Sequence, residues 1–109
     1  MFSKKDEKGY KSVLPKISQK TLIYGEKTLM AEFRLEKGAK LPGHSHPHEQ
    51  TGYMVSGLMD LTIGEKTCRI EPGDSWCIPG NVEHHAEAFE DSVAIEVFSP
   101  VREDYIEKA

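Results

Sequence analysis

The sequence predicts a single all-β domain, a sandwich or barrel of short strands. Nine glycines and six prolines interrupt its 109 residues at short intervals. Between these breaks lie short segments rich in β-branched, aromatic and other apolar residues, a spacing typical of β-sandwiches and barrels. In one of them Met59, Leu61 and Ile63 alternate with Asp60 and Thr62, as expected for a strand with one buried face. No segment before the tail keeps the apolar period of a helix.

The expected strands follow one another along the chain. They cover residues 21–27, 28–35, 50–56, 58–63, 67–70, 75–78 and 92–99. We expect an N-terminal arm over residues 1–12, a barrel over residues 13–100 and a C-terminal tail over residues 101–109. The tail is short, so we expect no more than a brief helical turn there.

Composition and charge exclude several classes of protein. Apolar residues make up 38% of the chain and charged residues 29%, which is enough for a folded core. Fourteen basic and eighteen acidic residues give a net charge of −4, which argues against a nucleic-acid partner. No apolar run is long enough to span a membrane, and no secretory signal precedes the domain, so we expect a cytoplasmic protein. Cys68 and Cys77 form no CxxC pair and are expected to serve as small packing groups.

The five histidines fall in two clusters. Residues two apart in an extended chain point to the same side, so His44 and His46 can face one point. Gln50 lies an even number of positions from His46, which directs its amide oxygen to the same side. Adjacent strand residues face opposite sides, so only one of His84 and His85 can point inward; we expect His84 inside and His85 outside.

Three imidazoles and an amide oxygen that meet inside a small barrel would form a metal site. These ligands suit one divalent transition metal, Zn, Ni, Fe or Mn. Because His44, His46, His84 and Gln50 are neutral, the metal would keep its full charge and favour an anionic or polyhydroxylated small molecule. A single histidine in a turn is more often a surface group, but four positions together favour the metal. We place His48 at the rim of the site or behind its ligands.

Two motifs resemble those of the cupin superfamily. Residues 38–57, GAKLPGHSHPHEQTGYMVSG, resemble the first motif, G-x5-H-x-H-x3,4-E-x6-G, and residues 73–84, GDSWCIPGNVEH, resemble the start of the second, G-x5-P-x-G-x2-H-x3-N. This resemblance implies a single-domain cupin, a jelly-roll barrel also called a double-stranded β-helix. Gln50 replaces the usual Glu, as in the subset of cupins with three His and one Gln. Asn81 replaces a Gly and tolerates the left-handed conformation expected there, and Ala88 replaces the last Asn.

The C-terminal segment carries a narrower resemblance. Residues 96–105, EVFSPVREDY, are similar to the ending of the small pectin- and alginate-degradation cupins that open the ring of 4,5-unsaturated uronates. The resemblance implies a catalytic role for Glu96 and substrate contacts for Phe98 and Arg102. Alternation independently places Glu96 and Phe98 on one face. The chain departs from these enzymes at Glu96, where they carry Asp, and at Gly52, where some carry a polar side chain.

The leading hypothesis is therefore a metal-dependent isomerase that opens the ring of a small sugar acid. In this hypothesis Glu96 moves a proton, Arg102 binds the substrate carboxylate and Phe98 packs against the sugar. Two alternatives stay open: an oxygen-dependent cupin of the dioxygenase type, and a non-catalytic module that binds a sugar acid or a metal. Arg102 also fits a surface residue that forms an ion pair at a strand end.

A homodimer is expected from the resemblance. Small cupins commonly pair through sheet edges and often exchange N-terminal strands, and residues 12–18 are suited to that role. Covering an exposed strand edge gives this expectation a physical reason.

Overall fold

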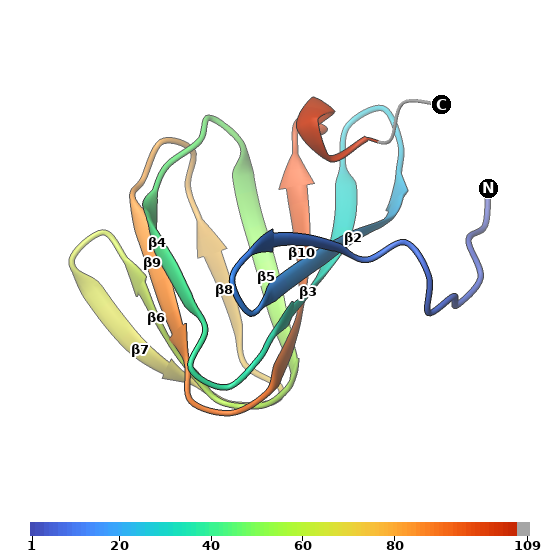
Figure 1. Cartoon of the computed structure of the whole chain (residues 1–109). Coiled ribbons are helices and arrows are strands. Elements are labelled where there is room, and N and C mark those ends of the chain that lie inside the picture. The colour runs from blue at the N-terminus through green and yellow to red at the C-terminus, as the bar shows by residue number, and fades with distance from the viewer. Residues whose placement is uncertain (107–109) are drawn as a thin grey trace.

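The chain folds into two antiparallel β-sheets that face each other (Figure 1). The structure, a computed structural model, describes residues 1–106. The strands are β1 Lys11–Leu14, β2 Ile17–Tyr24, β3 Leu29–Leu35, β4 Lys40–His44, β5 Glu49–Ser56, β6 Met59–Ile63, β7 Lys66–Ile70, β8 Ser75–Ile78, β9 His84–Ala88 and β10 Ser92–Ser99, and a 3-10 turn, η1, spans Glu103–Tyr105. One sheet has the order β1-β2-β3-β10-β5-β8 and the other the order β4-β9-β6-β7.

Two neighbouring strands of the larger sheet carry the inward-facing polar residues. Every second residue of β10 is buried, and Glu96 and Phe98 belong to that inward set. The same alternation in β5 turns Gln50 and Gly52 inward. In the antiparallel register of these strands, Glu96 lies opposite Gly52 and Phe98 opposite Gln50. The four residues therefore share one patch of the inner sheet face.

Apolar side chains from both sheets fill the space between them. The buried members of this main cluster are Ile17, Leu35, Ala39, Met54, Met59, Leu61, Ile70, Ala86, Ala88 and Ala94. A smaller cluster of Leu29, Ala31 and Phe98 lies beside it, and Tyr105 of η1 packs against this cluster. The second cluster fixes η1 against the larger sheet.

The loop that carries His46 and the loop that precedes His84 are joined by backbone contacts. Asn81 has a φ of 65°, so the left-handed conformation expected at this position is confirmed. Its backbone N–H donates a hydrogen bond of 2.7 Å to the carbonyl of His46. Gly80 lies so close to the carbonyl of Pro47 that a Cβ atom would collide with it. These contacts fix the loop before β9 against the loop after β4.

The all-β prediction is confirmed, and η1 is the short helical turn expected in the tail. The strands expected from apolar segments do not include β1, β4 or β9. Pro42 and Gly43 interrupt the strand pattern of β4, and β9 begins with two histidines instead of apolar residues. The part of the expected tail at residues 107–109 lies outside the described residues. Among the residues described, none lies in a helix long and apolar enough to cross a membrane.

Candidate metal centre and the adjoining cavity

Three histidines converge between the two sheets. His44 ends β4, His84 begins β9, and the two residues are partners in the β4–β9 ladder. His46 follows in the loop after β4. Ring centroids lie 4.2 Å apart for His44 and His84 and 5.0 Å apart for His46 and His84. One ligand nitrogen from each of the three residues lies within 4.8 Å of the others, so this cluster can bind a metal ion.

The backbone fixes the tautomer of all three imidazoles. Each Nδ1 faces a carbonyl oxygen two residues away, and because a carbonyl only accepts, each Nδ1 carries the hydrogen and Nε2 keeps a lone pair. The distances are 3.0 Å from His44 to Pro42, 3.0 Å from His46 to His48 and 2.9 Å from His84 to Val82. Nε2 of His84 is buried, and no described residue forms a hydrogen bond with it. A metal ion would satisfy this nitrogen.

Gln50 brings a further lone pair to the same point. Its side chain is buried in β5, and its Oε1 lies 3.0 Å from Nε2 of His46. Two lone pairs at this distance repel each other unless a cation lies between them or the amide is turned to present its NH2. A proton is a poor candidate, because burial and then the charge of Arg102 lower the pKa of His46. Burial also lowers the pKa of His84. This neutral donor set fits a divalent transition metal.

The carboxyl group of Glu96 lines a cavity of about 80 Å³ that also reaches His44, Gln50 and His84. Its Oε1 accepts a hydrogen bond of 2.8 Å from Nε1 of Trp76. Its Oε2 is buried and has no hydrogen-bond partner within residues 1–106. Burial raises the pKa of Glu96 to about 8, although the Trp76 bond acts in the opposite direction. In the metal-free chain, burial therefore favours the protonated form of Glu96 at neutral pH.

Phe98 and Arg102 lie at the same cavity. Phe98 is almost fully buried, with its ring centroid 5.8 Å from that of His46. The guanidinium of Arg102 lies over the ring of Tyr105, 4.0 Å from its centroid, and 5.0 Å from that of Phe98. It also donates hydrogen bonds of 3.2 and 2.7 Å to the carboxylate of Asp104. Arg102 thus forms the ion pair of a strand-end residue, yet its side chain is only 14% exposed and lines the cavity.

The remaining histidines lie outside the converging group. His48 is half-buried, its ring centroid is 5.7 Å from that of His46, and its carbonyl oxygen orients His46. His48 therefore lies behind His46. His85 is exposed. The structure therefore gathers His44, His46, His84 and Gln50 at one point and leaves His85 on the surface.

Sequence analysis missed Trp76 and Tyr105 as residues of the site. The pattern predicts Trp76 to be a core residue, and it does pack against the main cluster, but it also lines the cavity and donates a hydrogen bond to Glu96. The feature that could have indicated the role of Trp76 was Gly52, an inward-facing glycine that lies opposite Trp76 in the neighbouring strand. Tyr105 lies in the tail, where no periodic pattern indicates its direction.

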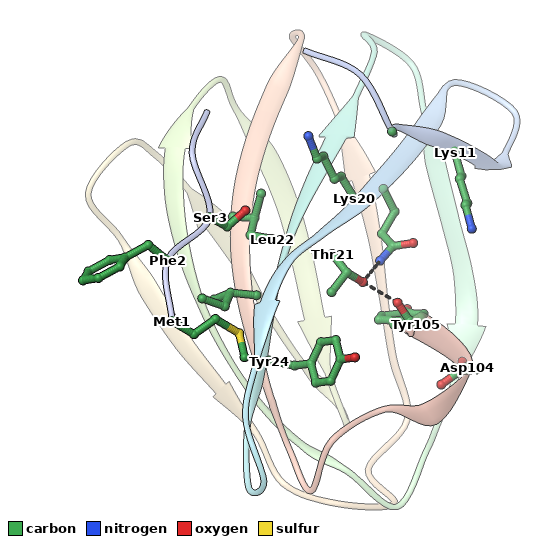
Figure 2. Close-up of a pocket in the computed structure, with 13 residues that line it drawn as sticks. Met1, Phe2, Ser3, Lys11, Lys20, Thr21, Leu22, Tyr24, Asp104 and Tyr105 are labelled. Atoms are coloured by element: carbon green, nitrogen blue, oxygen red, sulfur yellow. Dashed lines mark hydrogen bonds between the residues drawn. The ribbon is translucent and has the colours of Figure 1, made fainter. Parts of the chain in front are cut away.

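A second hollow, of about 420 Å³, lies outside the barrel against β2 (Figure 2). No histidine lines it. At its edge, the hydroxyl of Thr21 donates a hydrogen bond of 2.6 Å to the carbonyl of Tyr105 and accepts one of 3.3 Å from the amide of Gln19. These bonds anchor η1 to β2 and so help to hold Arg102 at the cavity.

A sequence model of the cupin domain matches residues 31–99, more than half of the chain and all of the converging histidines. The chain belongs to the cupin family. The cupin is 30% identical over 104 residues to the pectin degradation protein KdgF of Dickeya dadantii (strain 3937), an alignment that covers 93% of this chain and 94% of the relative. This relative is named for pectin degradation, and the described histidine cluster of the cupin can bind a metal ion.

Solved structures agree with this assignment. The structure of KdgF from Halomonas sp. superimposes with a TM-score of 0.91 at 30% identity and covers 97% of the cupin and 98% of that chain. An RmlC-like cupin from Shewanella frigidimarina NCIMB 400 also gives a TM-score of 0.91, at 26% identity, over 96% of this chain and 95% of that one. The expected cupin barrel is therefore confirmed.

Proposed function

We propose that this cupin is a metal-dependent isomerase that opens the ring of a 4,5-unsaturated uronate. One observation carries the proposal: the buried carboxyl group of Glu96, with one oxygen unpaired among the described residues and its pKa raised by burial, shares a cavity with the histidine cluster. Similarity to KdgF supports a substrate derived from pectin. An acid beside a metal site is suited to moving a proton within a sugar acid.

The Nε2 atoms of His44, His46 and His84, with Oε1 of Gln50, would hold one divalent transition metal, Zn, Ni, Fe or Mn. A bound metal supplies Lewis-acid polarisation of the substrate oxygens and helps to orient the sugar. The hydrogen bonds from each Nδ1 to the backbone keep the three Nε2 lone pairs directed at this position.

Arg102 would bind the substrate carboxylate. Its guanidinium already binds a carboxylate through two hydrogen bonds, that of Asp104, so its geometry suits this partner. The cavity of about 80 Å³ is smaller than the roughly 300–1,000 Å³ usual for ligand sites. Arg102 and Tyr105 form part of its wall. We therefore expect the substrate carboxylate to replace Asp104 on Arg102, with an outward shift of η1 that exposes Phe98 to the sugar.

Glu96 would carry the proton that ring opening requires. In its neutral form it donates a proton to C4, and the C4–C5 double bond becomes a single bond while a positive charge develops on C5 and the ring oxygen. The resulting carboxylate then takes the proton of the anomeric hydroxyl. As this proton leaves, the bond between C1 and the ring oxygen breaks, which gives an aldehyde at C1 and a ketone at C5. Glu96 ends in the protonated form in which it began.

The test follows the double bond directly. Metal-loaded protein is incubated with unsaturated galacturonate, and the loss of ultraviolet absorbance of the conjugated double bond is measured. We expect a rate well above the spontaneous one; a rate equal to it would reject this substrate class. Glu96→Gln is the matched control, because it keeps the shape of the side chain and removes its acid function.

We also propose that the cupin forms a homodimer. The outer face of the larger sheet exposes Met30, Tyr53 and Val55, of which Tyr53 is 51% exposed, and β1 is an edge strand. Exposed apolar side chains on this face, together with an open edge strand, favour a second copy as the covering partner. Size-exclusion chromatography with light scattering tests this, and a single species of 12.3 kDa would contradict it.

A further inference from the structure

The carboxyl group of Glu96 is fixed at one oxygen and free at the other. Nε1 of Trp76 donates a hydrogen bond of 2.8 Å to Oε1, whereas Oε2 is buried and has no partner in the part of the chain that the structure describes. In a neutral carboxyl group, the oxygen that accepts a hydrogen bond is the carbonyl oxygen. When Glu96 is protonated, this hydrogen bond therefore favours the proton on Oε2, the oxygen that has no partner among the described residues.

The hydrogen bond between Trp76 and Glu96 joins two strands that are not neighbours in the sheet. Trp76 belongs to β8 and Glu96 to β10, and β5 lies between these strands. Gly52 of β5 is the register partner of both residues. Neighbouring strands lie about 4.8 Å apart, so the indole must extend over β5 to reach the carboxyl group.

Gly52 makes this crossing possible. A Cβ atom at this position would overlap with the indole ring of Trp76 and with Oε1 of Glu96. The backbone of Gly52 has no positive φ that would explain the glycine. The need for glycine therefore comes from the two side chains that meet above it.

We propose that Trp76 and Gly52 are positioning residues that fix the carboxyl group of Glu96 so that Oε2 presents its proton to the substrate. This inference rests on the proposed function and deepens it, since it assigns the reacting oxygen. Without the indole N–H, the carboxyl group can rotate, and its proton is no longer restricted to Oε2.

Trp76→Phe tests this positioning, because it removes the N–H donor and keeps an aromatic ring. We expect kcat for unsaturated galacturonate to fall at least about tenfold, within the range of general acid catalysis, and KM to change less than about twofold. Gly52→Ala should have the same effect, since its methyl group displaces the indole. Cys77→Ser, at an exposed position of the same strand, is the matched control and should leave both constants unchanged. Metal content should stay the same in all three variants.

A second measurement needs no substrate. Trp76 is the single tryptophan of the chain, so its fluorescence reports directly on this contact. We expect its emission to change with a midpoint near pH 8, as Glu96 ionises, and Glu96→Gln to abolish the change. The other charged or titratable groups that line this cavity are Arg102, Tyr105, His44 and His84. Any contribution from them would persist in Glu96→Gln, so the difference between the two titrations isolates Glu96.

The outcomes separate this inference from the proposed function. Wild-type kcat in Trp76→Phe, or identical emission titrations for the wild type and Glu96→Gln, would overturn the positioning role. If the wild-type protein opens no ring, the proposed function fails, and the fluorescence comparison still decides whether Trp76 fixes this carboxyl group.

Discussion

His44 and His84 are direct partners across the β4–β9 ladder, and their ring centroids lie 4.2 Å apart. The candidate metal centre therefore depends on the register of two strands far apart in the sequence. A slip by one residue would turn His84 away and bring His85 to the inner face. The adjacent histidines His84 and His85 therefore offer a matched pair of variants.

Metal ions should stabilise the wild-type protein through His84 but not through His85. We expect an added divalent ion, at about 100 times its Kd, to contribute about 2.7 kcal/mol and to raise Tm by at least about 5 °C. His84→Ala should lose this increase, and His85→Ala should keep it. Thermal unfolding with and without Zn²⁺, Ni²⁺ or Mn²⁺ provides the measurement. An equal increase in all three proteins would place the ion elsewhere.

Stability should fall as pH rises, because Glu96 is harder to ionise in the folded protein. Burial raises its pKa from 4.5 to about 8, so the unfolded chain releases the proton first. The contribution of Glu96 is fully present below pH 4.5 and is lost progressively as pH rises to about 8. Urea unfolding of metal-free protein at several pH values measures this. Glu96→Gln should show a smaller loss, and parallel curves for the two proteins would contradict the raised pKa.

Arg102 and Asp104 should affect substrate binding in opposite directions. Arg102→Lys removes the two-pronged guanidinium contact, so we expect KM for the uronate to rise about tenfold or more while kcat changes little. Asp104→Asn removes the carboxylate that competes for Arg102, so we expect KM to fall. Steady-state kinetics on unsaturated galacturonate tests both variants. Unchanged KM values would show that Arg102 serves only its ion pair with Asp104.

Gly57 should be essential for stability, whereas Gly73 should tolerate substitution better. Both have positive φ values, of 98° and 95°. A Cβ atom at Gly57 would collide with Ser92 and with the backbone of Asp91, but one at Gly73 would meet no atom within 4 Å. We expect Gly73→Ala to cost about 1 kcal/mol and Gly57→Ala more than 2 kcal/mol. Equal losses in chemical unfolding would contradict the role of the collision.

The inward direction of Glu96 could be predicted from the sequence, because alternation along a strand depends only on local spacing. The direction of His44 and His46 follows from the same spacing. Their meeting with His84 required the cupin motifs, since strand pairing between distant segments leaves no local pattern. The hydrogen bond between Trp76 and Glu96 could not be predicted from local patterns. It joins side chains of β8 and β10, which lie on either side of the strand that contains Gly52.

In the N-terminal arm and the C-terminal tail, local sequence patterns also failed to predict contacts that depend on tertiary packing. Pro15 and Lys16 form a turn that lets β2 begin at Ile17, four residues before the expected strand. The carboxylate of Asp104 was not predicted as the partner of Arg102, since the pair forms only where η1 folds back over Phe98. Local patterns thus indicate the direction of the candidate ligands and of Glu96, and tertiary packing determines what holds them.

The most direct test titrates a divalent metal into metal-free protein and measures bound metal and the rate of ring opening of unsaturated galacturonate in the same samples. We predict that the rate rises in proportion to bound metal and levels off at a single ion per chain. A full rate without metal, or a fully loaded protein no faster than the spontaneous reaction, would contradict the account.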